Sequence, residues 1–409
     1  MKYNKLISIN ELSNLLDVAI PKLLAWERNN KLVPIKMDSN GIRFYSRSQL
    51  KDFDVAQEVF NSQWDSEIKI KPLRKYTSIE LFAGAGGMAI GMEKAGFHHI
   101  LLNEIDKFAC ATLRKNRPNW NVIEGSIENI DFNEFRGKVD VVTGGFPCQA
   151  FSSAGKKRGF EDARGTLFFE FARCVNEVKP KVFIGENVKG LFQHDNGNTL
   201  EVIKATIVEL GYTLVEPRVL KAMYFKVPQK RERLFLIGIR NDLIGKVEFK
   251  FPSPYHKVLT VNDALFKGEL FDTDVPVSDG VQYPKRKKEI MDLVPEGGYW
   301  KDLSDEHQRE YMGGSYFLGG GKTGLARRLS SEAPSLTLVC SPAMKQTERC
   351  HPFETRPLTV RESARIQTFP DDWIFEGGKN QAYKQIGNAV PVNLAWSVGR
   401  SVVDYLNKI

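Results

Sequence analysis

A cysteine at the end of an apolar run is the first residue of this chain that could do covalent chemistry. Cys148 lies in GGFPCQAFSSAG, and the run VDVVT before it, bounded by glycines, predicts a buried strand. A thiol of ordinary pKa, about 8.5, is only a few per cent thiolate at neutral pH, yet it is strongly nucleophilic. From this stretch alone, Cys148 is either a small core residue or a nucleophile exposed just past a strand end.

Charged side chains border two other apolar runs. Glu186 lies near the end of the run KVFIGEN, where a carboxylate is costly to bury unless it has a partner or a proton to move. Arg231 and Arg233 lie in QKRER at the start of a further run, and a solvated basic turn is the alternative there. Because the strands of an open α/β sheet deliver their carboxyl ends to one crevice, Glu186 is expected beside Cys148.

A glycine-rich stretch, ELFAGAGGM (80–88), follows the first strong strand pattern. Glycines between a strand and a helix let the backbone approach a ligand closely, although a tight turn without a ligand is the alternative. The next strand ends in NEID, which places Glu104 where such sheets offer a carboxylate to ribose hydroxyls. The two features together predict a nucleoside-containing cofactor.

The elements that must position these residues alternate between strands and helices from Tyr76 onward. Apolar runs of strand length, such as YTSIELF, HILLNEI and LFLIGIR, are separated by helical stretches such as LFFEFARCVNEV and NTLEVIKATIVELG. This alternation predicts right-handed βαβ units and an α/β fold with a mostly parallel sheet covered by helices on both faces.

The remaining pattern divides the chain into further segments. The N-terminal stretch has a capping box at Ser8, a proline in the first turn of a second helix and an Asn-Gly hairpin, and so predicts a winged helix-turn-helix. A small helical docking domain is the alternative. The expected domains are 1–72 with a linker to about 75, a catalytic domain over 76–255, an irregular Gly-rich and basic domain over 256–355, and a return segment over 356–409.

Composition narrows the class of protein. The formal net charge of +8 makes an anionic partner such as nucleic acid a weak expectation. The five cysteines form no CxxC and no metal-ligand spacing, so neither a metal site nor a disulfide framework is expected. We see no signal peptide, and no apolar stretch approaches the roughly 18–20 residues that span a membrane. A soluble, cytoplasmic protein is expected.

These motifs resemble an ordered series found in one enzyme family. ELFAGAGG, NEID, GGFPCQAFS, RGTLFFE, ENVKGL, QKRER, RPLTVRESARIQTFP and QIGNAVP are similar to the motifs of the DNA (cytosine-5)-methyltransferases, in their order and across residues 76–409. The PCQ, ENV and QxRxR elements together are highly specific. The N-terminal stretch resembles the helix-turn-helix of MerR-type regulators. The resemblance implies the Rossmann-like fold of methyltransferases that use S-adenosylmethionine.

The resemblance also implies a mechanism. The target cytosine swings out of the duplex, Cys148 attacks its C6, and the enamine-like C5 takes the methyl group. Glu186 matches the carboxyl that holds the cytosine N3 and amino group and supplies a proton, while Arg233 matches the arginine at the cytosine O2 and Arg231 a neighbouring basic contact. Loss of the C5 proton and expulsion of the thiolate complete the cycle.

S-Adenosylmethionine is implied at the glycine loop, with Glu104 on the ribose and Phe82 near the adenine. Two residues depart from the family pattern: Ser126 replaces an aspartate, and Ile105 replaces an aromatic residue. The residues expected to contact the cofactor are Phe82, Ala83, Gly84, Gly86, Gly87, Glu104, Ile105, Ser126, Ile127, Pro147, Asn388 and Ala389.

The irregular segment is, by the same resemblance, the target-recognition domain. Arginine can contact guanine and glutamine can contact adenine, although phosphate or solvent contacts are the alternative for each residue. Steep salt dependence of DNA binding is expected. The residues expected to contact DNA are Gln149, Ser152, Lys322, Arg327, Arg328, Thr337, Gln346 and Arg349; Cys350 and His351 are expected to be structural.

Two other functions remain as alternatives: an RNA (tRNA) cytosine-5 methyltransferase, and a DNA-binding regulator with an inactive methyltransferase fold. The large recognition segment argues against the first, and the intact set of Cys148, Glu186, Arg231 and Arg233 argues against the second. The expected setting is a type II restriction–modification system, with a monomer acting on double-stranded DNA and a cognate endonuclease encoded nearby. For the N-terminal module the hypothesis is repression of its own promoter or of a linked restriction gene; a simple gain of non-specific DNA affinity is the alternative.

Overall fold

The computed structural model describes residues 6–147, 167–320 and 322–409. The chain forms two compact units, each built from separate segments. The first comprises Met1–Ile68, Met223–Lys230 and Ser253–Thr368, and the second comprises Lys69–Ala222, Arg231–Pro252 and Phe369–Ile409. The N-terminal module therefore groups with the irregular segment that follows Ser253. The four domain ranges expected from the sequence stay predictions.

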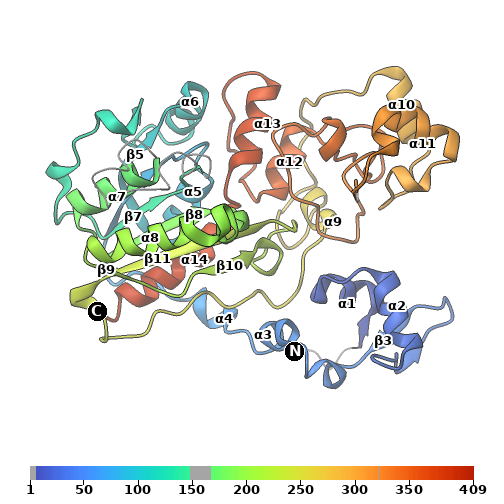
Figure 1. Ribbon diagram of the computed structural model, residues 1–409, viewed down its shortest axis with the longest axis horizontal. Helices are drawn as coiled ribbons and strands as arrows, with labels where there is room; N and C mark the ends of the chain where they lie inside the picture. Colours follow the sequence, from blue (N-terminus) through green and yellow to red (C-terminus); the bar gives the residue numbers. More distant parts are fainter. Residues whose placement is uncertain (1–5, 148–166, 321) are drawn as a thin grey trace. The chain divides into compact units, whose positions relative to one another are not determined.

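The second unit is organised around an eight-stranded sheet in the order β10-β11-β8-β7-β4-β5-β6, with β9 paired to β11 (Figure 1). The neighbours from β8 to β6 run parallel, whereas β11 is antiparallel to β8, β9 and β10. The strands are β4 (Tyr76–Leu81), β5 (Phe97–Glu104), β6 (Val122–Glu124), β7 (Val141–Gly144), β8 (Val182–Asn187), β9 (Tyr212–Leu214), β10 (Arg218–Lys221) and β11 (Glu232–Arg240).

The predicted mostly parallel α/β sheet is confirmed. The central strands β7 and β8 are buried along their whole length, as the continuous apolar runs predicted for strands covered on both faces. Strands β9 and β10 were not predicted, because each is short and mixes exposed with buried positions. Only pairing with the long strand β11 defines them.

Helices pack on this sheet through apolar faces. In α7, Phe168, Phe171, Val175 and Val178 recur at helical spacing and join the core cluster that also contains residues of α8. A different contact joins α5 to α14, where a Cβ built on Gly91 would lie 2.4 Å from that of Ala395. The helices of this unit are α5 (Gly87–Ala95), α6 (Lys107–Asn116), α7 (Leu167–Val178), α8 (Asn198–Glu209), α13 (Lys379–Asn388) and α14 (Val392–Leu406).

The first unit begins with the predicted helix-turn-helix. Ser8 and Glu11 form the capping box that starts the first helix, and a proline occupies the first turn of the second. A small antiparallel sheet in the order β1-β3-β2 includes the predicted hairpin. The elements are β1 (Ile7–Ser8), α1 (Ile9–Leu16), α2 (Ile20–Arg28), β2 (Lys36–Met37), β3 (Arg43–Tyr45), α3 (Asp54–Phe60) and α4 (Trp64–Glu67).

The later part of the first unit is irregular, as predicted. Short helices and turns surround a small core that includes Tyr283, Met291, Trp300 and Met312. The helices are α9 (Val261–Leu265), α10 (Lys285–Asp292), α11 (Asp305–Met312) and α12 (Val360–Ile366). Among the described residues of the whole chain, no helix is both long enough and apolar enough to cross a membrane.

Glu80 in β4 is a buried carboxyl that makes the stability of the fold depend on pH. Its carboxyl is buried, the Thr143 hydroxyl lies 3.4 Å away, and burial raises the pKa of Glu80 from 4.5 to about 8. Because the folded-state pKa is raised, the protonated form stabilises the fold fully below pH 4.5, and this contribution is lost as the pH rises toward 8.

We expect the substitution Glu80→Gln, which keeps the side chain neutral, to flatten this dependence. The free energy of unfolding of the wild type should fall by about 1 kcal/mol per pH unit more than that of the variant as the pH rises through this window. Urea unfolding at a series of pH values checks this, with the exposed Glu209→Gln as control. Equal pH slopes for wild type and Glu80→Gln would contradict it.

Candidate active site

The glycine loop after β4 adopts the conformations that its residue types allow. Gly84 and Gly86 have φ of 53° and 89°, and Phe82 also has a positive φ of 56°. A Cβ built on Gly87 would lie 2.3 Å from the Val390 carbonyl oxygen, so only glycine fits this position at the start of α5. The loop therefore presents bare backbone at the carboxyl end of the central strand.

Glu104, at the end of β5, fastens this loop. Its carboxylate accepts hydrogen bonds from the backbone N–H groups of Gly84 at 2.7 Å, Ile105 at 2.8 Å and Asp106 at 2.8 Å. The Gly125 N–H also donates to the Glu104 carbonyl oxygen at 2.9 Å. The structure thus brings the glycine loop, the acid after β5 and the segment before Ser126 to one place.

The other expected cofactor residues differ in exposure. Ile105 is 72% exposed, and Ala83, Ile127 and Ala389 are buried. The Ser126 hydroxyl accepts a hydrogen bond from Glu128 N at 3.4 Å. A Cβ on Gly87 would also lie 3.1 Å from that of Ala389, which places this residue beside the loop. Pro147 follows β7 and is exposed, as is Asn388 at the end of α13.

Glu186 and Arg233 form a buried ion pair. The Arg233 Nε lies 2.6 Å from the Glu186 Oε1, and the side chains are 12% and 11% exposed. The antiparallel register, in which Phe235 faces Glu186, brings the two residues together from β11 and β8. Burial raises the pKa of Glu186, although the charges of Arg233 and Arg231 act to lower it. A carboxyl with a raised pKa is suited to hold and deliver a proton.

Arg231 lies two residues before Arg233 and is 2% exposed. One of its guanidinium nitrogens donates to the Gly387 carbonyl oxygen at 2.8 Å. It therefore connects the start of β11 to the end of α13. Arg231 also carries one of the charges that act on the pKa of Glu186.

The residues just before the PCQ motif lie against β8. The Asn187 Nδ2 donates to the Phe146 carbonyl oxygen at 2.8 Å, and a Cβ built on Gly145 would lie 2.8 Å from the Glu186 Oε2. The doubled glycine before Phe-Pro-Cys and the Asn of ENV were the available signals, but their positions relative to Glu186 required the structure. Cys148, Gln149 and Ser152 lie outside the described residues.

Two of the arginines expected to contact DNA are buried and bonded to carbonyl oxygens of the protein. Arg328, 5% exposed, donates to the carbonyl oxygens of Val294 at 2.8 Å and Met291 at 2.8 Å. Arg349, 6% exposed, donates to the Thr337 carbonyl oxygen at 2.8 Å. These bonds favour a structural role for Arg328 and Arg349, and the DNA contacts of both stay predictions.

The other expected DNA contacts are more accessible. Gln346 is exposed, and Arg327 donates to the Gly297 carbonyl oxygen at 2.8 Å while it lies 4.7 Å from the centre of the Tyr299 ring. The ammonium of Lys322 donates to the Tyr316 carbonyl oxygen at 3.3 Å.

Thr337 is partly buried, and its hydroxyl donates to the Lys230 carbonyl oxygen at 3.2 Å. Among the described residues, no group of three or more His, Cys, Asp or Glu side chains could hold a metal ion, and the structural role expected of Cys350 and His351 stays a prediction.

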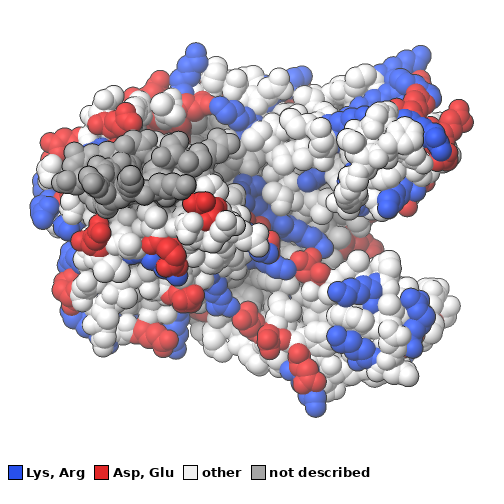
Figure 2. All heavy atoms as spheres, viewed as in Figure 1, with Lys and Arg blue, Asp and Glu red and all other residues white. Residues whose placement is uncertain are grey.

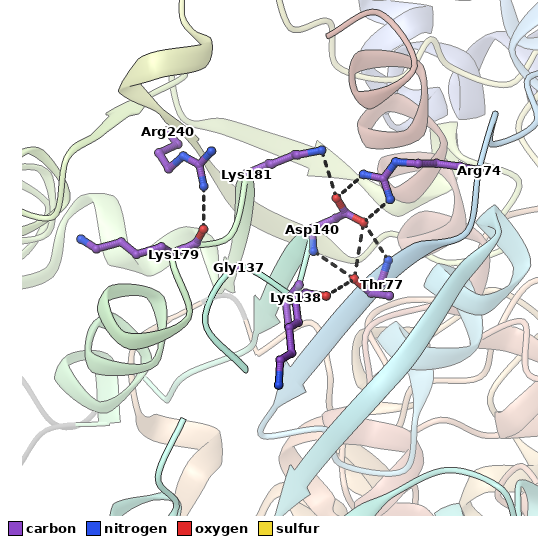
Figure 3. Close-up of a pocket in the computed structure, with 9 residues that line it drawn as sticks. Arg74, Thr77, Gly137, Lys138, Asp140, Lys179, Lys181 and Arg240 are labelled. Atoms are coloured by element: carbon purple, nitrogen blue, oxygen red, sulfur yellow. Dashed lines mark hydrogen bonds and ion pairs between the residues drawn. The ribbon is translucent and has the colours of Figure 1, made fainter. Parts of the chain in front are cut away.

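A cavity of about 380 Å³ lies at the opposite edge of the sheet, where β4, β7 and β8 begin (Figure 3). Arg74 and Lys181 both point to Asp140, at 2.9 Å and 3.3 Å from its carboxylate oxygens (Figure 3). Burial alone would raise the pKa of Asp140, but the bond from Arg74 and the charge of Lys181 outweigh burial and hold it low. The cavity thus lies at the amino-terminal ends of these strands and is lined by ion pairs. The glycine loop and Glu186 lie at the other ends of the strands.

Comparison with known proteins identifies the family of this chain. The family model described as C-5 cytosine-specific DNA methylase matches residues 76–404. The chain belongs to the C-5 cytosine-specific DNA methylases. It is therefore an enzyme that methylates C5 of cytosine in DNA. The model of the MerR helix-turn-helix regulators matches residues 7–63, in agreement with the module found there.

Similar proteins cover nearly the whole chain. It is 62% identical over 402 residues to the type II methyltransferase M.Eco47II of Escherichia coli, covering 98% of this chain and 96% of that one. It is 59% identical over 392 residues to M.PspPI of a Psychrobacter species, covering 96% and 94%. A solved structure of a prophage-encoded DNA modification methyltransferase from E. coli matches with a TM-score of 0.58 at 25% identity, over 81% of this chain and 100% of that chain.

The methylase site yields a prediction at Gly145. We expect Gly145→Ala to push the Glu186 carboxylate away from its place beside Arg233, because the new methyl would lie 2.8 Å from Oε2. The turnover number for DNA methylation should fall by about 100-fold, by analogy with the loss of one preorganised catalytic group. Transfer of tritiated methyl groups to DNA measures this.

The matched control is Gly190→Ala, where the nearest atom to a new Cβ is a Val188 methyl at 3.9 Å. This variant should retain wild-type turnover. If Gly145→Ala is as active as Gly190→Ala, the close approach of residue 145 to Glu186 has no catalytic consequence.

Proposed function

We propose that this methylase activates cytosine covalently through Cys148, with Glu186 as the proton donor and S-adenosylmethionine as the methyl donor. The observation that carries the proposal is the buried pair of Glu186 and Arg233, held at 2.6 Å, against which Gly145 begins the loop to Cys148. Cytosine C5 is a poor nucleophile, so methylation there requires prior attack at C6, and a thiolate is suited to that attack.

Glu186 has the properties that this step requires. Burial raises its pKa above that of an ordinary glutamate, although the charges of Arg233 and Arg231 act to lower it, and a raised pKa suits a carboxyl that delivers a proton. A proton given to cytosine N3 prevents a full negative charge on the ring as the Cys148–C6 bond forms. Arg233 keeps one carboxyl oxygen fixed, and so leaves the other oriented toward the base. Departure of the C5 proton and of the thiolate then restores the aromatic ring.

The carboxyl edge of β4 and β5 fits S-adenosylmethionine. The positive φ values of Gly84 and Gly86 leave backbone without side chains at the start of α5, and the Glu104 carboxylate lies beside it, 2.7 Å from Gly84 N. Backbone N–H groups and a carboxylate suit the polar and hydroxyl groups of a nucleoside. When bound, the cofactor supplies a methyl group activated on sulfur. The exposed Ile105 and the Ser126 hydroxyl would border the adenine.

The similar proteins support a proposal for the biological setting. M.Eco47II and M.PspPI are named type II methyltransferases, and each matches nearly all of this chain. The proposed role is the modification enzyme of a type II restriction–modification system, acting as a monomer in the cytoplasm on double-stranded DNA, with an endonuclease of the same specificity encoded nearby.

The decisive experiment is bisulfite sequencing of plasmid DNA from cells that express the wild type or Cys148→Ala. 5-Methylcytosine at one short sequence, absent with the variant, is expected because the thiol is the attacking group. Cys340→Ala, which removes an exposed cysteine, is the control and should methylate normally. Methylation that persists in Cys148→Ala would overturn the covalent mechanism. Methylation absent from every sample would contradict activity on DNA and would favour an RNA substrate or an inactive methyltransferase fold.

The surface of the N-terminal module carries exposed basic side chains around α2. In Figure 2, the region that carries α2 and β3 in Figure 1 shows Lys and Arg, whereas acidic side chains gather near α3 and α4. Arg28, Lys31 and Lys36 are exposed on α2 and the segment after it. A basic helix-turn-helix face of this kind binds DNA phosphates and bases. We propose that this face binds DNA upstream of the gene or of a linked restriction gene.

We expect Arg28→Glu in the full-length protein to weaken binding to upstream DNA by about tenfold in a gel-shift assay, because a phosphate contact becomes a repulsion. Lys51→Glu, the same charge change at an exposed position outside α2 and the hairpin, should have a smaller effect. Equal binding of upstream and unrelated DNA by the wild type would mean that the module only adds non-specific affinity.

A further inference from the structure

Helix α1 of the N-terminal module is bound to segments that lie far along the chain. Asn14, only 8% exposed, donates from Nδ2 to the Glu332 carbonyl oxygen at 2.8 Å. Asn10 donates to the Glu332 carboxylate at 2.8 Å, and the Tyr224 hydroxyl donates to the Leu15 carbonyl oxygen at 3.0 Å. Within the first unit, these hydrogen bonds fix how the segments around Glu332 and Tyr224 lie against α1. Apolar packing alone would not specify this position, because it is not directional.

The end of α1 and the C-terminal part of the module are also held by contacts. Asp17, which ends α1 with φ of 52°, lies 2.9 Å from the ammonium of Lys230. At the far end, the Trp64 and Tyr255 rings meet edge to face at 5.1 Å, and the Ser253 N–H donates to the carboxylate of Glu67. The module therefore packs against other segments of this unit through several specific contacts.

The segments held by α1 are interlocked with each other. The Lys230 N–H donates to the Ser335 carbonyl oxygen at 2.7 Å, and the Ser335 N–H donates to the Pro228 carbonyl oxygen at 2.9 Å. The Gln229 side-chain oxygen accepts from the Leu338 N–H at 2.9 Å. Residues 228–230 and 335–338 thus form one short paired junction. Asp17, the cap residue of α1, contacts Lys230 on one side of it, and Asn14 contacts Glu332, three residues before the other side.

This junction directly precedes Arg231 along the chain, and within the first unit it includes Thr337. Lys230 directly precedes Arg231, and Thr337, which is expected to contact DNA, donates to the Lys230 carbonyl oxygen at 3.2 Å. We propose that α1 is a positioning element for target recognition, which holds this junction in the form that engages the DNA target. The inference rests on the proposed function, and it gives the N-terminal module a part in engagement of the methylation target.

Two consequences separate this role from that of an independent repressor. Damage to the contacts of α1 should weaken engagement of the methylation target even on DNA without any upstream sequence. The chemical step should change little, because Glu186 and Arg233 are held by β8 and β11 and not by α1. The expected signature is a change in the KM for DNA with a nearly constant kcat.

The test uses Asn14→Asp and Asp17→Asn in the full-length protein, with a short synthetic duplex that contains the methylated sequence. Each variant replaces a polar side chain by one of the same shape, and asparagine tolerates the left-handed backbone of residue 17. We expect the KM for DNA to rise about tenfold in Asn14→Asp and about threefold in Asp17→Asn. Asp52→Asn, an exposed position of the same module, is the control and should match the wild type.

A charge exchange adds a readout that a general loss of stability would not give. Asp17→Lys alone should raise the KM, and its combination with Lys230→Asp should restore part of the loss by re-forming the pair. Hydrogen exchange at residues 224–230 and 331–338 should be faster in Asn14→Asp than in the control. If Asn14→Asp folds poorly, Asp17→Asn, whose ion pair is partly exposed, still provides the test.

An unchanged KM for DNA in both variants would overturn the positioning role. A fall in kcat together with a rise in KM, both in proportion to the loss of thermal stability, would also overturn it. Failure of the proposed function gives a different result, because the wild type would then produce no 5-methylcytosine in any duplex.

Discussion

The buried ion pair between Glu186 and Arg233 is the interaction on which the candidate site depends. Removing two charges from water is costly, and the cost is offset only when the geometry of the pair is good. Here the antiparallel register of β8 and β11 supplies that geometry and holds the two groups 2.6 Å apart. The pair allows Glu186 to stay buried, and burial raises the pKa of its carboxyl although the charges of Arg233 and Arg231 act to lower it.

The order of the sheet explains why residues from distant motifs meet. β4 lies between β5 and β7, and β7 lies beside β8, with all four strands parallel. Their carboxyl ends carry, in turn, the glycine loop, Glu104, Gly145 and Glu186. Parallel strands end at one edge, so the cofactor side and the base side of the proposed reaction share that edge. At the opposite edge, Asp140 is neutralised by Arg74 and Lys181.

The N-terminal module has two faces with different roles. Its α1 face is bound by Glu332, Tyr224 and Lys230, whereas the basic residues of α2 stay exposed. A module bound through α1 and exposed at α2 can link contact with DNA to the state of the junction held by α1. Because the module contacts residues 224–230 and Glu332 within the first unit, the basic face of α2 belongs to the same unit as the junction.

Much of this protein was determined by sequence alone. Alternating apolar strands and amphipathic helices predicted the α/β sheet, and the capping box at Ser8 predicted the start of α1, because these features depend on local periodicity and backbone hydrogen bonding. The family motifs indicated the methylase function, which the family match over residues 76–404 confirmed. The roles of Cys148 and of the individual site residues stay predictions.

Tertiary structure decided which side chains meet. No local pattern distinguished the buried Arg328 and Arg349 from arginines that are free to contact DNA, because their carbonyl acceptors come from separate segments. The same holds for Gly145 beside Glu186 and for α1 against Glu332. Sequence fixes the elements through short-range periodicity, whereas burial and pairing of polar groups depend on neighbours brought together only by the folded chain.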